Sequence, residues 1–470
     1  MQFWRSKWAA AVGSVVVLVA CGGGGGDSTP EPEEVRPHDA RTFPLDETAL
    51  AFEALPGTTT TRFHGVLNGA GYRIEVPQNW NGRLVMYAHG YRGTNVPLTV
   101  SNPPIRAHLI ANGYAWAASS YSKNYYDVRA GVEDTNALAL AFSRLTGLAE
   151  PTRRYIIGHS MGGHITGAAI EEETFRTANH KVRYHGAVPM CGVMGDTELF
   201  DYFSAYQTAA QYFAGVPLYP TTAWADINAL VRSRLFTTFS SSVITPTADG
   251  EKLKGVVMNL TGGNRPIFEQ GFANAGLQQV VWGTFGGDGT INGILNASVL
   301  DTRNMVLQID SDPALSEEET LLNQRLLRVT PVPDANRLRR DGLRWIPKVN
   351  GQFSIPVVSL HTLGDMYVPF SMQQIYKRRA DANGSGGWLV QRAIRAPSHC
   401  DFTVAEQVAA FDDMVAWEQN GTRPEGDEVL DAAVVADPAY GCRFTVNAGG
   451  PYDNPTTVTV RTLMPACPTP

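Results

Sequence analysis

A serine flanked by glycines, placed directly between a buried strand and a helix, is the feature that most constrains the fold of this chain. Residues 154–157 end in the apolar run Tyr155-Ile156-Ile157, which is typical of a buried strand, and residues 161–173 have helical spacing. Between them the motif GHSMG, residues 158–162, leaves no room for a loop. In so sharp a turn a side chain at either glycine position would clash, and the serine oxygen is presented at the end of the strand. The motif therefore predicts a nucleophile, Ser160, at the edge of a buried sheet.

Strands and helices alternate on both sides of this turn. The expected strands are residues 84–88, 113–122, 154–157 and 184–190, and the expected helices between them are residues 105–112, 132–148 and 161–173. This alternation predicts an α/β fold, a parallel sheet with crossover helices on both faces. An earlier strand at 72–76 is separated from 84–88 by the turn formers PQNWNG, which predicts that these two strands form a hairpin.

The alternation breaks after residue 191 and resumes near residue 350. Helical patterns within the break lie at residues 200–215, 224–236 and 315–327, and residues 283–289 are loop-rich. A bare loop of this length is not expected in a compact protein, so we expect an inserted cap or lid at 192–349 rather than a second independent domain. The core, 43–191 and 350–420, is completed by strands at 355–360 and 388–394 and by helices at 372–379 and 404–418. Residues 421–470 are rich in glycine and proline, with a β-like run at 456–462, and predict a small β appendage.

The motif GHSMGG resembles the nucleophile elbow of the α/β-hydrolase superfamily, and the resemblance covers residues 72–191 and 355–418. In that superfamily the acid and then the histidine follow the serine along the chain. Asp365 follows the strand 355–360 in a setting similar to the family's Gly-Asp-x-x-Val-Pro, and His399 is the only histidine beyond it. The resemblance implies that Ser160 is the nucleophile, His399 its general base and acid, and Asp365 the residue that orients His399.

Other interpretations of these residues are open. Asp365 could cap a turn, and His399 could be an ordinary surface histidine. Three further acids do not combine the right chain order with the end of a strand, and they are Asp196, Asp310 and Asp381. His159 and His164 flank the serine, but we expect them to pack or to form hydrogen bonds away from its oxygen.

An oxyanion hole requires two donors aimed at the developing negative charge. One is expected to be the backbone N–H of Met161, directly after the nucleophile. The segment HGYRG, residues 89–93, resembles the family's His-Gly oxyanion segment and implies the N–H of Tyr91 as the other, although a plain glycine turn is the alternative. Side chains near the expected mouth suit an apolar or aromatic acyl group unless they belong to the core, and they are His89, Tyr91, Tyr121, Tyr125, Tyr126 and Tyr367.

The first twenty residues resemble the signal peptide of bacterial lipoproteins. Two cations precede an apolar run at 8–20, which is too short to span a bilayer. The sequence LVACG, residues 18–22, is similar to a lipobox, which implies lipidation of Cys21; an ordinary secretory peptide is the alternative. Residues 21–42 are glycine-rich and polar and read as a flexible tether. The expected location is the bacterial cell envelope, with the outer membrane favoured because no aspartate follows Cys21, or the secreted fraction.

If Cys21 carries lipid, four cysteines remain in an oxidising compartment, and two disulfides are expected. The pair His399-Cys400 is similar to the tannase and feruloyl-esterase family, in which a disulfide links cysteines beside the histidine and the serine. This chain departs from that pattern, because no cysteine lies beside Ser160. Of the three possible pairings we expect Cys191–Cys400, at the rim where the catalytic loops gather, and Cys442–Cys467.

The formal net charge of −7 disfavours nucleic acid as a partner. No cofactor or metal is expected, since the stretch DGTING at 288–293 lacks the distal glutamate of a calcium loop. We expect a serine carboxylic-ester hydrolase that meets the membrane only through its lipid anchor. Candidate substrates are polyester oligomers, as for a polyester depolymerase, aromatic esters and lipid esters. The alternatives are a serine peptidase of the prolyl type and a catalytically inactive hydrolase-like binding protein.

Overall fold

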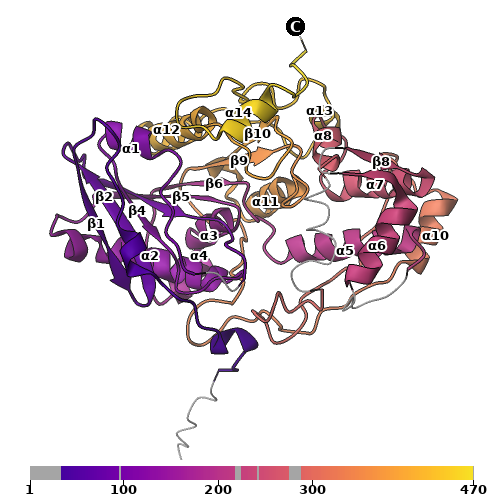
Figure 1. The fold of residues 1–470 in the computed structure, drawn as a ribbon, viewed down its shortest axis with the longest axis horizontal. Helices are drawn as coiled ribbons and strands as arrows, with labels where there is room; N and C mark the ends of the chain where they lie inside the picture. Colours follow the sequence, from indigo (N-terminus) through magenta and orange to yellow (C-terminus); the bar gives the residue numbers. More distant parts are fainter. Residues whose placement is uncertain (1–32, 95–96, 217–223, 241–242, 275–286, 469–470) are drawn as a thin grey trace, which may run out of the picture. The chain divides into compact units, whose positions relative to one another are not determined.

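Eight strands form the central sheet of the computed structural model, which describes residues 33–94, 97–216, 224–240, 243–274 and 287–468. The spatial order is β1-β2-β4-β3-β5-β6-β9-β10 (Figure 1). Strand β2 runs antiparallel to both of its neighbours, and the remaining pairs are parallel, as predicted. The strands are β1 Thr60–Leu67, β2 Ala70–Pro77, β3 Arg83–Ala88, β4 Ala115–Ser119, β5 Arg153–His159, β6 Gly186–Met190, β9 Val357–Thr362 and β10 Leu389–Ile394.

The prediction that β2 and β3 form a hairpin is wrong. Strand β2 pairs with β1 and β4, whereas β3 lies between β4 and β5. The hairpin turn is Asn68-Gly69, where both residues have positive φ, 52° and 82°. Asn-Gly is the strongest two-residue signal for a hairpin, because both central residues of the turn need this left-handed conformation. The longer PQNWNG segment instead connects strands that are not neighbours.

Helices cover both faces of the sheet. Side chains alternate along a strand, so Ile156 of β5 joins one core and Tyr155 and Ile157 join the other, which explains why the middle of this strand is apolar on both faces. Helices α2, α3 and α11 contribute to the first core, and α1 and α12 contribute to the second. Their bounds are α1 Arg106–Ala111, α2 Val128–Thr146, α3 Met161–Ala169, α4 Glu172–Thr177, α11 Ser371–Ala382 and α12 Val404–Asn420.

The regular elements described between β6 and β9 are mainly helices, joined by long irregular segments (Figure 1). The predicted helices in this segment are present as α5, α6 and α10, and a short hairpin of β7 and β8 was not predicted. Side chains such as Phe200, Leu253 and Ile291 share one apolar core with Ile156 of the sheet. Much of the predicted loop at 283–289 lies outside the described residues. The elements are α5 Glu198–Phe213, α6 Trp224–Leu235, β7 Phe236–Phe239, β8 Ile244–Pro246, α7 Ala248–Leu260, α8 Phe268–Phe272 and α10 Glu317–Arg325.

The C-terminal appendage is not β-rich, which corrects the prediction for residues 421–470. Its regular elements are the short helices α13 Ala432–Val435 and α14 Pro455–Arg461, and the run predicted as β-like forms α14. The side chain of Asn454 accepts a hydrogen bond from Thr456 N, and Pro455 occupies the first turn. An N-cap followed by proline starts a helix, and here it overrides the strand propensity of the β-branched residues that follow.

Residues that were predicted to belong to the tether, which was expected to end at residue 42, pack against the start of α2. Arg36 and His38 are buried, 4% and 0% exposed, and both contact the carboxylate of Asp127 at the start of α2. The predicted signal peptide and Cys21 lie outside the described residues. None of the helices in the described part of the chain is long and apolar enough to cross a membrane.

Candidate active site

Ser160 occupies a sharp turn between β5 and α3. Its backbone has φ 59° and ψ −121°, a conformation that L-residues adopt only where the surrounding structure enforces it. A Cβ on Gly158 would lie 2.2 Å from Gly162 O, and a Cβ on Gly162 would lie 2.0 Å from Ala88 O. Both flanking glycines are therefore required by backbone packing, as the motif predicted.

Ser160, His399 and Asp365 form one hydrogen-bonded relay. His399 Nε2 lies 2.8 Å from Ser160 Oγ, and His399 Nδ1 lies 2.5 Å from Asp365 Oδ2. The three residues come from the turn after β5, the loop after β9 and the loop after β10. Neutral imidazole in this position can accept the serine proton at Nε2 while its Nδ1–H donates to the carboxylate. The structure thus brings together the three residues that the sequence nominated.

The carboxylate of Asp365 is fully buried and fixed on both oxygens. Its Oδ1 accepts hydrogen bonds from the backbone N–H groups of Tyr367 and Val368, both at 2.9 Å. This leaves Oδ2 to face His399. The ring of Tyr367 then meets the imidazole edge-on, with centroids 5.4 Å apart. The orientation of His399 is therefore set by a carboxylate that cannot rotate without losing two backbone hydrogen bonds.

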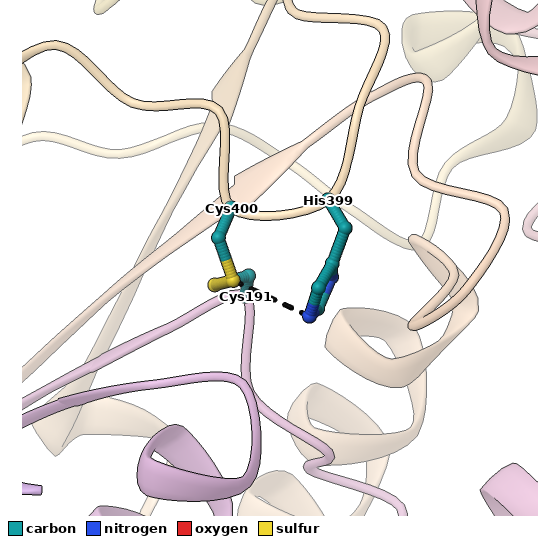
Figure 2. Close-up of side chains that lie close together, drawn as sticks. All are labelled: Cys191, His399 and Cys400. Carbon is teal, nitrogen blue, oxygen red and sulfur yellow. Dashed lines mark hydrogen bonds between the residues drawn. A yellow bond between two sulfur atoms is a disulfide. The ribbon is translucent and has the colours of Figure 1, made fainter. Parts of the chain in front are cut away.

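A disulfide links the histidine loop to the end of β6. Cys400 bonds to Cys191, and the second predicted disulfide, Cys442–Cys467, is also present. Cys400 and His399 are consecutive residues of the same loop (Figure 2). The Cys400 sulfur lies 3.4 Å from His399 Nε2. These two sulfurs and the imidazole lie close enough to suggest a metal site. Because both sulfurs are committed to the disulfide, they are not the thiolates that a metal would require.

The expected oxyanion segments lie next to the nucleophile. Met161 is the first residue of α3, so its N–H has no acceptor within the helix and lies at the positive end of the helix dipole. In the opposite loop, a Cβ on Gly90 would lie 3.2 Å from both Ser160 Cβ and His159 O. A side chain here would make a tight contact that Ser160 or the loop must relieve by a few tenths of an ångström. The loop that carries Tyr91 therefore packs closely against Ser160 and, through Ala88 and His89, against Gly162 in the first turn of α3.

No protein-family model matches the chain. Over 438 residues the chain is 22% identical to the o-phthalyl amidase of Xanthobacter agilis. This alignment covers 80% of this chain and 92% of the amidase. Among solved structures, feruloyl esterase B from Aspergillus oryzae superposes with a TM-score of 0.46 and 14% identity, over 80% of this chain and 84% of that one. Candida antarctica lipase A gives a TM-score of 0.38 and 16% identity, over 80% and 78% of the two chains.

The architecture itself defines the fold. A mostly parallel sheet with helices on both faces carries a serine elbow after β5, and acid and histidine follow in that chain order. This chain has the α/β-hydrolase fold.

His89, predicted to line the pocket, is buried instead. The side chain is 2% exposed, its ring stacks on Tyr121, and its Nδ1 and Nε2 lie 2.7 and 3.2 Å from the carbonyl oxygens of Gly90 and Ser120. Burial lowers its pKa to about 4, so the ring is neutral near pH 7. His89 therefore packs under the loop after β3 through Gly90, Ser120 and Tyr121 rather than lining the predicted pocket.

The predicted tyrosines divide into two groups. Tyr121 and Tyr126 are core residues, because the hydroxyl of Tyr121 donates to His89 O and that of Tyr126 lies 2.9 Å from His164 Nδ1. Tyr125 is also buried and packs against His38 and Phe43, whereas Tyr367 lies beside His399 and has Tyr91 as a neighbour. Burial raises the pKa of the Tyr91 hydroxyl, and nearby Tyr125 adds to the effect; burial and nearby Tyr91 do the same for Tyr367. The hydroxyls of Tyr91 and Tyr367 therefore stay protonated at neutral pH.

A cleft next to His399 was not predicted. It has a volume of about 600 Å³ and lies between α8, the histidine loop and α14. No pattern in the sequence pointed to it, since α14 was expected to be a strand and its distance from the catalytic residues is not encoded in any local motif.

Proposed function

We propose that this protein is a serine hydrolase that cleaves carboxylic esters. The single observation that carries the proposal is the relay in which Asp365 binds His399 Nδ1 and His399 Nε2 binds Ser160 Oγ. An isolated serine hydroxyl is a weak nucleophile, and this arrangement supplies the base that activates it.

The proposed reaction has two halves. Ser160 Oγ attacks the ester carbonyl carbon while His399 Nε2 takes the serine proton, and the oxyanion forms at the N–H groups of Met161 and Tyr91. Collapse of this intermediate breaks the bond to the leaving oxygen, which receives the proton from His399. Water then attacks the acyl-enzyme, His399 takes a proton from that water, and Ser160 leaves with the same proton. The products are an acid and an alcohol, and the enzyme is restored.

Amide hydrolysis is a second candidate, because the curated relative is named an amidase. The same relay can protonate an amine leaving group. Comparing turnover of a 4-nitrophenyl acyl ester with the matching 4-nitroanilide separates the two activities, and a higher kcat/KM for the anilide would overturn the ester proposal. The prolyl-peptidase alternative is tested with a proline-amide substrate in the same assay.

An inactive binding protein is the remaining alternative, and the intact relay argues against it. A fluorophosphonate probe should label the native protein and fail to label the Ser160→Ala variant. An unlabelled native protein that turns over none of these substrates would overturn the proposal of a serine hydrolase as a whole.

We also propose that the protein is exported and lipid-anchored through Cys21. The LVACG motif supports this, and two disulfides fit an oxidising compartment. Labelled fatty acid should be incorporated into the native chain and not into Cys21→Ser. Polyester oligomers, aromatic esters and lipid esters are the substrate classes to compare, with aromatic acyl groups favoured by the tyrosines beside the relay.

A further inference from the structure

The cleft beside His399 has walls from three segments far apart in sequence. They are the end of α8, the histidine loop and the helix α14 with the residues after it (Figure 1). The lining residues that matter for its chemistry are Gln270 and Asn274 at α8, His399 and Asp401 in the loop, and Val460 and Leu463 at α14. Its volume, about 600 Å³, is within the range of ligand-binding pockets.

The position of His399 indicates which half of the ester this cleft would hold. The carbonyl oxygen of a bound ester must face the oxyanion donors at Met161 and in the loop after β3. The leaving oxygen must instead lie within reach of His399 Nε2, because that nitrogen delivers its proton. The described walls include His399 but neither the serine elbow nor the oxyanion loop. His399 is the residue that the relay and the cleft share, so a group that extends from the leaving oxygen past His399 would have this cleft as its space.

The residues that line the cleft favour an uncharged ligand. Of the described residues that line the cleft, Asp401 is the only acid, and its side chain is 8% exposed. Leu463 is 73% exposed and Val460 is partly exposed, so apolar surface is available, and amide side chains of Gln270 and Asn454 add hydrogen-bonding groups. An aromatic or aliphatic alcohol with one or two polar groups matches this mixture better than a charged group.

The α14 wall is fixed rather than loosely attached. Arg461 forms two hydrogen bonds of 2.9 Å to the carboxylate of Glu406, and both side chains are fully buried. Arg461 also donates to Asp401 O in the histidine loop. The wall and the loop that carries His399 are thus parts of one hydrogen-bonded unit, as a site that selects among leaving groups requires.

We propose that this cleft binds the leaving group, the uncharged alcohol half of the ester, and that α14 determines which alcohols are accepted. The inference rests on the proposed ester hydrolysis and adds the specificity site for one half of the substrate.

The test uses the full protein and esters that share one acyl group, such as butyrate esters of methanol and of 2-naphthol. Val460→Trp narrows the cleft. It should lower kcat/KM for the naphthyl ester by about tenfold or more and leave the methyl ester nearly unchanged. Rapid-mixing kinetics separates acylation from deacylation. The deacylation rate should not change, because the alcohol has already left the acyl-enzyme.

Val434→Trp is the matched control, since Val434 lies on α13, is 42% exposed and is not among the lining residues. Val434→Trp should not change the ratio of the kcat/KM values for the two esters. If Val460→Trp folds poorly, Leu463→Asp at the exposed position makes the same comparison, with selective loss of the naphthyl ester expected. An equal loss of kcat/KM for both esters, no loss of kcat/KM for either ester, or a change in the deacylation rate would overturn the inference. If native turnover did not depend on Ser160, the proposed function itself would fail.

Discussion

Cys400, the residue directly after His399, is bonded to Cys191, the residue directly after β6. The loop that carries His399 is therefore tied covalently to the end of the strand next to the turn that holds Ser160. Asp365 holds the ring of His399 from its other nitrogen. The disulfide thus acts on the position of the catalytic loop, in a chain long enough to bury its core without such a link.

Removal of this link should reduce turnover more than substrate binding. In Cys191→Ser/Cys400→Ser, a displacement of His399 by about 1 Å is expected to lower kcat by about 10²-fold. The bond closes a segment of 209 residues, for which loop entropy predicts a loss of about 5 kcal/mol in the free energy of unfolding. Steady-state kinetics and denaturant unfolding measure the two effects.

Cys442→Ser/Cys467→Ser is the control, because that bond spans only 25 residues in the appendage. It should reduce stability with a much smaller effect on kcat. Equal kcat losses in the two double variants would show that the Cys191–Cys400 bond has no special effect on His399.

Asp365→Asn should inactivate the enzyme by imposing the wrong tautomer on His399. The backbone N–H groups of Tyr367 and Val368 would hold the amide oxygen, so the amide NH₂ would face His399 Nδ1. His399 would then accept at Nδ1 and carry its proton at Nε2, where it cannot take the proton of Ser160. A loss of about 10⁴-fold in kcat/KM is expected. A loss below tenfold in kinetic assays would contradict this role of Asp365.

The sequence predicted the relay because each of its members follows a buried strand, and chain order left one histidine for the role. It could not predict the cleft, because Arg461 reaches Glu406 across 55 residues and no local pattern encodes that contact. The hairpin was misassigned for a related reason. Apolar alternation identifies a strand, whereas its neighbours depend on the whole sheet, and the more informative signal was the Asn68-Gly69 turn.

Arg461→Met should strongly destabilise the fold. It would leave Glu406 buried without its cation, and removing one partner of a buried pair costs about 3–5 kcal/mol. Denaturant unfolding measures the loss. Arg303→Met serves as the comparison, since Arg303 and Asp301 form an exposed pair and its loss should cost less than about 1 kcal/mol. Similar values for the two variants would argue against a structural role of the buried pair.

His361 should make stability depend on pH in the acid range. Burial lowers its pKa from 6.5 to about 4, and the neutral ring contacts Val368 O at Nε2 and Gln373 at Nδ1. Between these two pKa values the unfolded chain binds a proton that the folded chain does not, so stability falls as pH decreases from about 6.5 to 4. In His361→Gln the slope should be smaller by up to about 1.4 kcal/mol per pH unit.

Unfolding free energies of both proteins, measured from pH 4 to 8, give this comparison. The difference near pH 8 is the cost of the substitution itself, and only the change in that difference at lower pH reports the titration. Parallel curves for the two proteins would show that His361 does not titrate in this way.

Gly90→Ala should reduce catalysis at little cost in stability. The added methyl group would lie 3.2 Å from Ser160 Cβ and 3.8 Å from Ser160 Oγ, a tight contact that is relieved when the loop after β3 shifts by a few tenths of an ångström away from Ser160. Loss of one well-placed oxyanion donor costs about 10²–10³-fold in kcat. Gly387→Ala is the matched control, because nothing lies within 4 Å of its added Cβ, and it should leave kcat unchanged. If Gly90→Ala retained full kcat while a fluorophosphonate probe still labelled Ser160 at the native rate, the loop after β3 would not supply the oxyanion donor.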